Sequence, residues 1–275
     1  MNPTDVLGGL LAGGVGGIAS GFLGITSGGI LVPLLVLILG KDQHVAQGIS
    51  LLAQVVPTSL SGVRNYRQSG HRVPLGWLIW LAVGFAVGGC VGALLATHVS
   101  DRALQWTFVG YLVILDAIVV LRPPRQKVDG AEEIEQPQLS WAALAAIGAV
   151  AGWSSGFLGI GGGLAITALM TGLLKISQHR SQAVSLAVTA LPVTLPAALL
   201  YAQQGTELPW ATIVALIVGL WIGTGIGARL ANRVSPNSLR VVLVVIIAAM
   251  AIFMAFKAGD DGEFMKPRAA LRRND

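Results

Sequence analysis

The sequence predicts an all-α integral membrane protein made of two similar halves. Of its 275 residues, 54% are hydrophobic and only 11% are charged, whereas a soluble domain carries about 25% charged residues. Apolar stretches near the length of about 20 residues that a helix needs to cross a bilayer recur along the chain. The second half also repeats the first at a fixed spacing. We therefore expect two repeats of about five hydrophobic segments each.

The apolar segments of the first half are expected at residues 6–40, interrupted near the centre, and at 43–65, 74–97 and 102–121. Those of the second half are expected at 140–160, 161–174, 179–201, 208–231 and 236–257. A polar stretch containing Pro123 and Pro124 separates the halves. The expected organisation is a first repeat at 1–121, a cytoplasmic linker at 122–138, a second repeat at 139–257 and a polar tail at 258–275.

The repeat becomes visible when each residue is compared with the residue 135 positions later. The motif Gln43-His44 then pairs with Gln178-His179, without a gap in the comparison. Other matched pairs are Ser20/Ser155, Gln47/Gln182, Ser50/Ser185, Pro57/Pro192, Tyr66/Tyr201, Gly88/Gly223 and Gly92/Gly227. So many identities at one offset indicate an internal duplication.

Each half has a glycine-rich interruption inside apolar sequence. Because each glycine costs about 1 kcal/mol relative to alanine in a helix interior, we expect the helices to break here, as re-entrant pairs or as tilted helices. Backbone N–H groups freed at membrane depth are tolerated beside a cavity, and the N-terminus of a half-helix favours an anion. The alternative is that small residues only allow close helix packing. The candidate substrate-binding residues here are Ser20, Gly24, Thr26, Ser27, Gly28, Ser155, Gly159, Gly161, Gly162 and Gly163.

A polar stripe follows each interruption. In the first half the spacing of three and four residues places five polar side chains on one helical face: Gln47, Ser50, Gln54, Thr58 and Ser61. The second half gives Gln182, Ser185, Thr189 and Thr194. The first three of each set are candidate substrate-binding residues. Uncharged amides and hydroxyls suit a small oxyanion that must bind and then leave, although hydrogen bonding between helices would explain the same residues. Pro192 and Pro196 predict a kink in the second of these helices.

Three titratable residues are candidates for proton coupling: His44, His179 and Asp116. The two histidines are repeat counterparts near helix starts, where an interfacial anchor or a helix cap is the alternative role. Asp116 lies inside an apolar segment, which marks it as a functional candidate. It is also close enough to the segment end to reach the interface.

The arginines predict that the second repeat is inverted relative to the first. Residues 64–73 contain three arginines, whereas their counterpart, 199–208, contains none, and the imbalance reverses between 229–240 and its counterpart. Basic loops stay in the cytoplasm, which places both chain termini outside. The glycines of 84–92 and 219–227 recur every four residues, and we expect them to form packing faces only.

Several functions are excluded or disfavoured. The single cysteine, Cys90, rules out an internal disulfide and a multi-cysteine metal cluster, and we expect no metal, no cofactor and no nucleic acid partner. The motif Gly152-Trp153-Ser154-Ser155-Gly156 fits the G-x-S-x-G pattern of hydrolases. That pattern requires a strand before the turn, so we expect no catalytic residue and no enzyme.

At these motifs the chain resembles the sulfite exporter family of TauE/SafE-like permeases. The resemblance rests on Ser155-Gly156-Phe157-Leu158-Gly159-Ile160-Gly161-Gly162-Gly163 and on Ser185-Leu186; the first half departs from the pattern, with Thr26-Ser27 in place of glycines. It implies a multi-pass secondary transporter of the bacterial inner membrane. Its expected substrate is sulfite, an organosulfonate or a related small anion, exported by alternating access with protons as a possible coupling ion. A passive anion channel and an intramembrane hydrolase are the alternatives.

Overall fold

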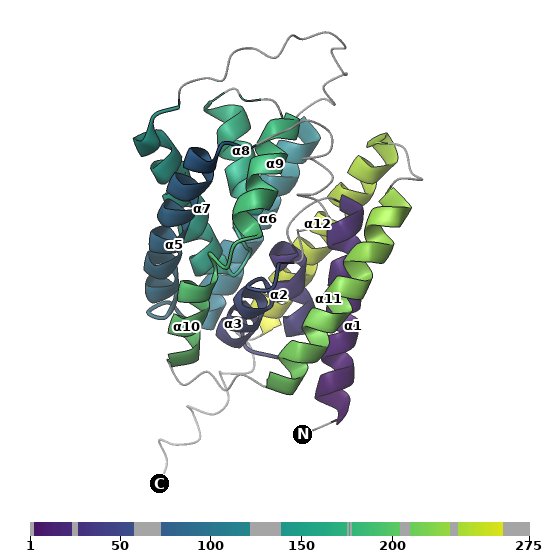
Figure 1. Cartoon of the computed structure of the whole chain (residues 1–275). Coiled ribbons are helices and arrows are strands. Elements are labelled where there is room, and N and C mark those ends of the chain that lie inside the picture. The colour runs from purple at the N-terminus through teal and green to yellow at the C-terminus, as the bar shows by residue number, and fades with distance from the viewer. Residues whose placement is uncertain are drawn as a thin grey trace.

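The computed structural model describes residues 3–23, 27–57, 73–121, 139–174, 176, 178–203, 210–231 and 236–260. Every regular element in these ranges is an α-helix (Figure 1). The expected linker at 122–138, the arginine-rich loop at 64–72 and residues 261–275 of the expected tail lie outside the described residues. The helices are α1 (Pro3–Leu23), α2 (Gly28–Ile38), α3 (Gln43–Ala53), α5 (Leu75–Ala96), α6 (Asp101–Leu121), α7 (Trp141–Leu158), α8 (Gly163–Gly172), α9 (Gln178–Thr189), α10 (Leu195–Gln203), α11 (Trp210–Ala231) and α12 (Pro236–Asp260).

In the part of the chain that the structure describes, four helices are long and apolar enough to cross a membrane. They are the Asp5–Phe22 part of α1, all of α5 and α7, and the Trp210–Gly227 part of α11. Large apolar side chains such as Val83, Val87 and Val91 are exposed along α5, as expected for a surface that faces lipid rather than water. Shorter apolar helices, α2 and the part of α12 from Val244 to Gly259, accompany these spans. The chain is therefore an all-helical, multi-pass membrane protein.

Two expected helices are interrupted in the structure. The helix expected at 43–65 is described as far as Ala53, where α3 ends, and residues 58–72 lie outside the described ranges. The segment expected as one kinked helix at 179–201 consists of two helices, because α9 ends at Thr189 and α10 begins at Leu195. Pro192 lies in the turn between them, and a proline within a helix removes a backbone donor and clashes with the preceding turn. The expected helix therefore ends before Pro192 instead of bending there, and Pro196 lies in the first turn of α10, where a proline is tolerated.

The long helices pack in pairs that join the two halves of the chain. α1 packs along α11, α5 packs along α7, and α6 lies against α12. A Cβ on Gly84, Gly88 or Gly92 of α5 would overlap with a backbone carbonyl of α7, so only glycine permits this approach. The glycines 135 positions later, Gly219, Gly223 and Gly227 of α11, meet the corresponding carbonyls of α1. These glycines form close-packing faces, as predicted.

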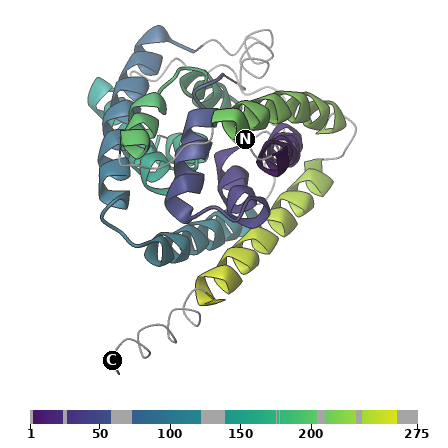
Figure 2. The same ribbon diagram turned by 90° about the horizontal axis from the view of Figure 1, so that it is seen from below.

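The contacts also give the directions of the helices. Successive glycines of α5 meet successively later residues of α7, so these two helices run parallel, and the same holds for α11 and α1. The α1–α11 pair starts at the lower end of the molecule in Figure 1, near the N-terminus, whereas the α5–α7 pair starts at the upper end. The view from below shows the short helices α2 and α3, coloured violet to dark blue, between the longer ones (Figure 2).

Candidate functional site

The second glycine-rich segment separates α7 from α8. α7 ends at Leu158, and α8 begins at Gly163. Between them Gly159, Gly161 and Gly162 have φ values of 73°, 86° and 62°, in the left-handed region that glycine adopts readily and other residues avoid. The glycines thus interrupt the helix because they supply a backbone conformation that a helix does not use. The predicted interruption is present.

The first glycine-rich segment lies between α1, which ends at Leu23, and α2, which begins at Gly28. Ser27 is buried, and its carbonyl accepts hydrogen bonds from the backbone N–H groups of Ile30 and Leu31 at 3.0 and 2.9 Å. Ser20, near the end of α1, is also buried. Two candidate residues, Gly24 and Thr26, lie outside the described residues.

The two interruptions touch each other. A Cβ on Gly28, the first residue of α2, would overlap with the carbonyl of Ile160 in the second interruption. Only a residue without a side chain allows this approach. Segments 135 residues apart in the sequence therefore come together between the two halves.

The polar stripe of α3 packs directly against the second interruption. Ser50 Oγ donates a hydrogen bond to the carbonyl oxygen of Gly159 at 2.8 Å. Gln54 Nε2 donates to the carbonyl and the hydroxyl of Ser50 at 3.0 and 3.1 Å. A Cβ on Gly161 would overlap with Gln54 Oε1, so this amide occupies the space beside the glycine. The stripe residues are thus brought together at the interruption.

Hydroxyl groups also hold the backbone on the other side of the interruption. Ser155 Oγ accepts a hydrogen bond from the N–H of Gly161 at 3.1 Å, and Ser185 Oγ donates to the carbonyl of Gly163 at 2.7 Å. Thr189 Oγ1 donates to the carbonyl of Ser185 at 3.0 Å, within its own helix. In this structure the hydroxyls of Ser50, Ser155 and Ser185 therefore satisfy backbone groups, which is the alternative role that the sequence left open.

Gln47 lies at the same place and has a partner that we did not predict. The hydroxyl of Tyr201, from α10, donates to Gln47 Oε1 at 2.8 Å and lies 3.0 Å from the carbonyl oxygen of Gly156. A Cβ on Gly159 would lie 2.9 Å from the Cα of Gln47. The signal for Tyr201 was its pairing with Tyr66 in the repeat, but that pairing gave no reason to place it beside Gln47.

The N-termini of the helices differ in how they are capped. At α7, Ser140 Oγ accepts from the N–H of Ala143 at 3.2 Å, and at α3 the carboxylate of Asp101 accepts from the N–H of His44 at 3.0 Å. By contrast, Ser27 makes no side-chain cap at α2, and Gly162 has no side chain to cap α8. Both of these uncapped N-termini are buried at the contact between the interruptions. The N–H of Gly163 bonds to the carbonyl of Gly161 at 2.7 Å, but no side chain among the described residues caps either helix end. Buried helix ends without a side-chain cap favour an anionic ligand.

Residues 6–254 match the model of the family described as sulfite exporter TauE/SafE. The chain belongs to this family. It is 30% identical to a probable membrane transporter protein of Bacillus subtilis over 69% of this chain and 76% of the relative. A probable membrane transporter protein of Xylella fastidiosa is 29% identical over 90% of this chain and 94% of the relative. A probable membrane transporter protein of Methanocaldococcus jannaschii is 24% identical over 89% of this chain and 93% of the relative. No solved structure matches.

His44 of this TauE/SafE family chain connects three helices. Its Nδ1 lies 2.7 Å from Asp101 Oδ1 at the start of α6, and its Nε2 lies 2.9 Å from the carbonyl oxygen of Ala96 at the end of α5. Both neighbours accept hydrogen bonds when the carboxylate is ionised, so the doubly protonated ring satisfies both. The hydrogen bond to Asp101 raises the pKa of His44, and the bond from His44 lowers the pKa of Asp101. Both residues lie outside the four candidate spans.

The remaining candidates are of two kinds. Gln182 and His179 belong to α9, but their side chains lie outside what the structure describes. Asp116 lies within α6, where its Oδ1 is buried and has no hydrogen-bond partner among the described residues. Ser154, the serine of the G-x-S-x-G pattern, is inside α7, and its hydroxyl donates to the carbonyl of Ala151 at 2.9 Å. It therefore lacks the sharp turn of a hydrolase nucleophile.

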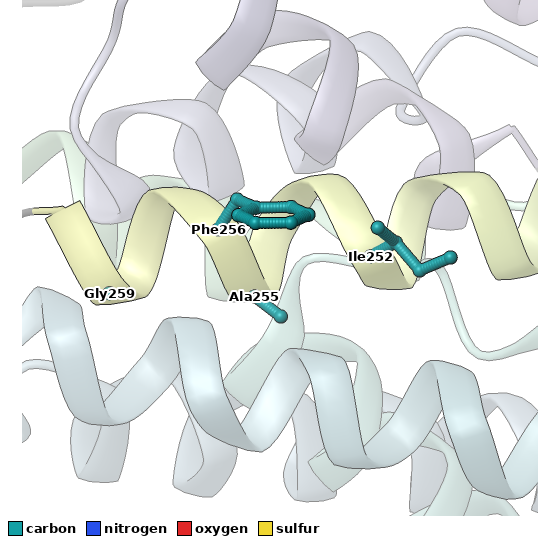
Figure 3. Close-up of a pocket in the computed structure, with 4 residues that line it drawn as sticks. All are labelled: Ile252, Ala255, Phe256 and Gly259. Atoms are coloured by element: carbon teal, nitrogen blue, oxygen red, sulfur yellow. The ribbon is translucent and has the colours of Figure 1, made fainter.

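A shallow pocket lies elsewhere, along the outer side of α12 (Figure 3). Ile252, Ala255, Phe256 and Gly259 line it, and Ile252 and Phe256 are largely exposed. This lining is apolar and includes none of the predicted binding residues, so it does not suit an anion in this TauE/SafE family protein.

Proposed function

We propose that this protein is a secondary transporter that exports sulfite, an organosulfonate or a related small sulfur-containing anion. The substrate would bind where the two interruptions meet, between α3 and α9. Transport would proceed by alternating access between two inverted repeats, residues 1–121 and 139–257, joined by a cytoplasmic linker. The bacterial inner membrane is the proposed location, and no catalytic step is involved.

The observation that carries this proposal is the pair of uncapped helix N-termini. α2 and α8 begin at the contact between the interruptions, whereas the N-termini of α3 and α7 are capped by Asp101 and Ser140. An uncapped N-terminus presents N–H groups and the positive end of the helix dipole. The side chains that touch the interruption, including Ser50, are uncharged. An anion held by dipoles and neutral donors binds without a permanent ion pair and can leave again, as transport requires.

The opposite directions of the helix pairs support the alternating mechanism. α1 and α11 start at one end of the molecule, and α5 and α7 start at the other (Figure 1). Transporters built from inverted repeats bind substrate near the bilayer midplane and expose it to each side by rocking one bundle against the other. We assign proton coupling to His44, because its hydrogen bonds link α3, which contacts the interruption, to α5 and α6. His179 and Asp116 are further coupling candidates.

The proposal is tested by uptake of radiolabelled sulfite and taurine into proteoliposomes. We expect saturable uptake and counterflow, whereas a passive channel would show neither. Gln182→Ala should abolish uptake while expression stays normal. Gly162→Leu should also abolish it, and because a side chain there overlaps with the ring of Phe85, this loss counts toward the site only when the variant protein is shown to be folded in the membrane.

The matched control is Gly225→Leu. Gly225 is an exposed glycine of α11 around which a Cβ meets open space, so uptake should be retained. Unchanged uptake in both Gly162→Leu and Gln182→Ala would contradict the placement of the site. Loss of uptake in Ser154→Ala would favour the hydrolase alternative.

A further inference from the structure

Two buried glutamines of α3 have amide atoms without hydrogen-bond partners among the described residues. Gln43 and Gln47 are each 0% exposed. Within the described ranges, neither amide atom of Gln43 has a partner, and Nε2 of Gln47 has none. The two residues are four positions apart, so they lie on the same face of α3, one turn from each other. Polar atoms buried in this way are normally bonded to protein, water or a ligand.

The surroundings of the two amides indicate what can bind there. Tyr201 holds the oxygen of Gln47, which leaves the NH₂ group of Gln47 to face an acceptor. Among the charged groups near Gln43, Asp101 accepts from the ring and from the backbone N–H of His44, and Asp42, which precedes α3, is exposed. The buried groups without partners here are the neutral amides, and their NH₂ donors suit the oxygens of a small oxyanion.

The position of the pair relates it to the proposed transport site. Gln47 lies against Gly159 of the interruption, and Gln43 is one turn nearer the start of α3. The turn before α3 contacts the start of α1, since Lys41 Nζ lies 3.8 Å from Asp5 Oδ2. The N-terminus is at the lower end of the molecule in Figure 1. The glutamines thus form a line from that end toward the interruption.

We propose that Gln43 and Gln47 form a second, neutral subsite for a small oxyanion, one helical turn outside the interruption. This proposal rests on the proposed transport of anions and adds Gln43, which the sequence analysis named as part of the repeat but not as a binding residue. The repeat carries the same pair at Gln178 and Gln182. An equivalent amide pair is therefore encoded in the second half.

The test measures binding of sodium sulfite to the purified full-length protein by titration calorimetry, with unfolding in the absence of sulfite as a second measurement. Gln43→Leu keeps the size of the side chain and removes the amide. We expect sulfite binding to weaken about 10- to 100-fold, as for the loss of one hydrogen bond to a charged group. The unfolding midpoint should stay the same or rise, because an unpartnered polar group is removed. Gln43→Glu should abolish binding through charge repulsion.

Ser181→Ala is the matched control, since Ser181 is equally buried and its hydroxyl also lacks a partner. It should leave sulfite binding unchanged. Binding by Gln43→Leu within twofold of wild type overturns the subsite alone. A Gln43→Leu protein that fails to fold also overturns it, because the amide then has a structural role. If wild type binds none of sulfite, sulfate, thiosulfate and taurine, the proposed function fails as well.

Discussion

Alanine in place of Gly161 should destabilise the folded protein by about 2–5 kcal/mol, from two separate costs. Gly161 has a φ of 86°, and a residue with a β-carbon pays about 1–2 kcal/mol to adopt a left-handed conformation. The new Cβ would also overlap with Gln54 Oε1, so the amide of Gln54 must move. Gln54 then loses its two hydrogen bonds to Ser50, each contributing about 0.5–1.5 kcal/mol.

The assay is the free energy of unfolding, measured by denaturant titration in mixed micelles. Gly110→Ala is the matched control, because Gly110 lies inside α6 and a Cβ there meets open space. Alanine at such a helical site should stabilise the protein by up to about 1 kcal/mol. If the Gly161→Ala protein is as stable as the Gly110→Ala protein, this refutes the claim that the backbone at Gly161 and its contact with Gln54 require a glycine.

Two further predictions concern packing and pH. Gly88→Ala should destabilise the protein strongly, because the Cβ overlaps with the carbonyl of Ala149, whereas Gly76→Ala on the same helix meets open space and should not; equal unfolding midpoints would contradict this. The pKa of His44 is raised above 6.5. The ion pair between His44 and Asp101 therefore stabilises the fold fully below pH 6.5, and this stabilisation is lost as the pH rises through the raised pKa. On the acid side, the lowered pKa of Asp101 means that this contribution is lost as pH falls through that value. The melting temperature of the wild type should therefore fall between pH 5.5 and 8.5, and that of Asp101→Asn should fall less. An equal fall in both proteins would contradict a stabilising role for the pair.

The sequence predicted the features that follow from local chemistry. Consecutive glycines are poor helix formers, so the interruption before Gly163 could be located without a structure. The four-residue spacing of Gly84, Gly88 and Gly92 places them on one helix face, and that face is where α7 packs. Hydropathy likewise located the long spans, because the bilayer requires a nearly continuous apolar segment.

The partners of the polar residues could not be predicted in this way. Periodicity shows which side chains share a face of one helix, but not which neighbouring element that face meets. Asp101 caps α3 from another helix, 57 positions along the chain from His44. Tyr201 reaches Gln47 across 154 positions. Both contacts depend on how α6 and α10 are packed, which is determined by the whole fold.

The two halves also differ more than their repeat suggests, and the sequence contains the reason. Ser50 bonds to Gly159 in the opposite half, whereas its counterpart Ser185 bonds to Gly163 in its own half. The interruptions differ where Ser27 corresponds to Gly162: Ser27 has a φ of −64° and Gly162 one of 62°. Serine avoids the left-handed conformation that glycine accepts, so the two backbones cannot follow the same path. Thr26 likewise corresponds to Gly161 of the second half. Equivalent serines meet different carbonyls, and this inequality accompanies the two positions at which glycine in the second half corresponds to a residue with a side chain in the first.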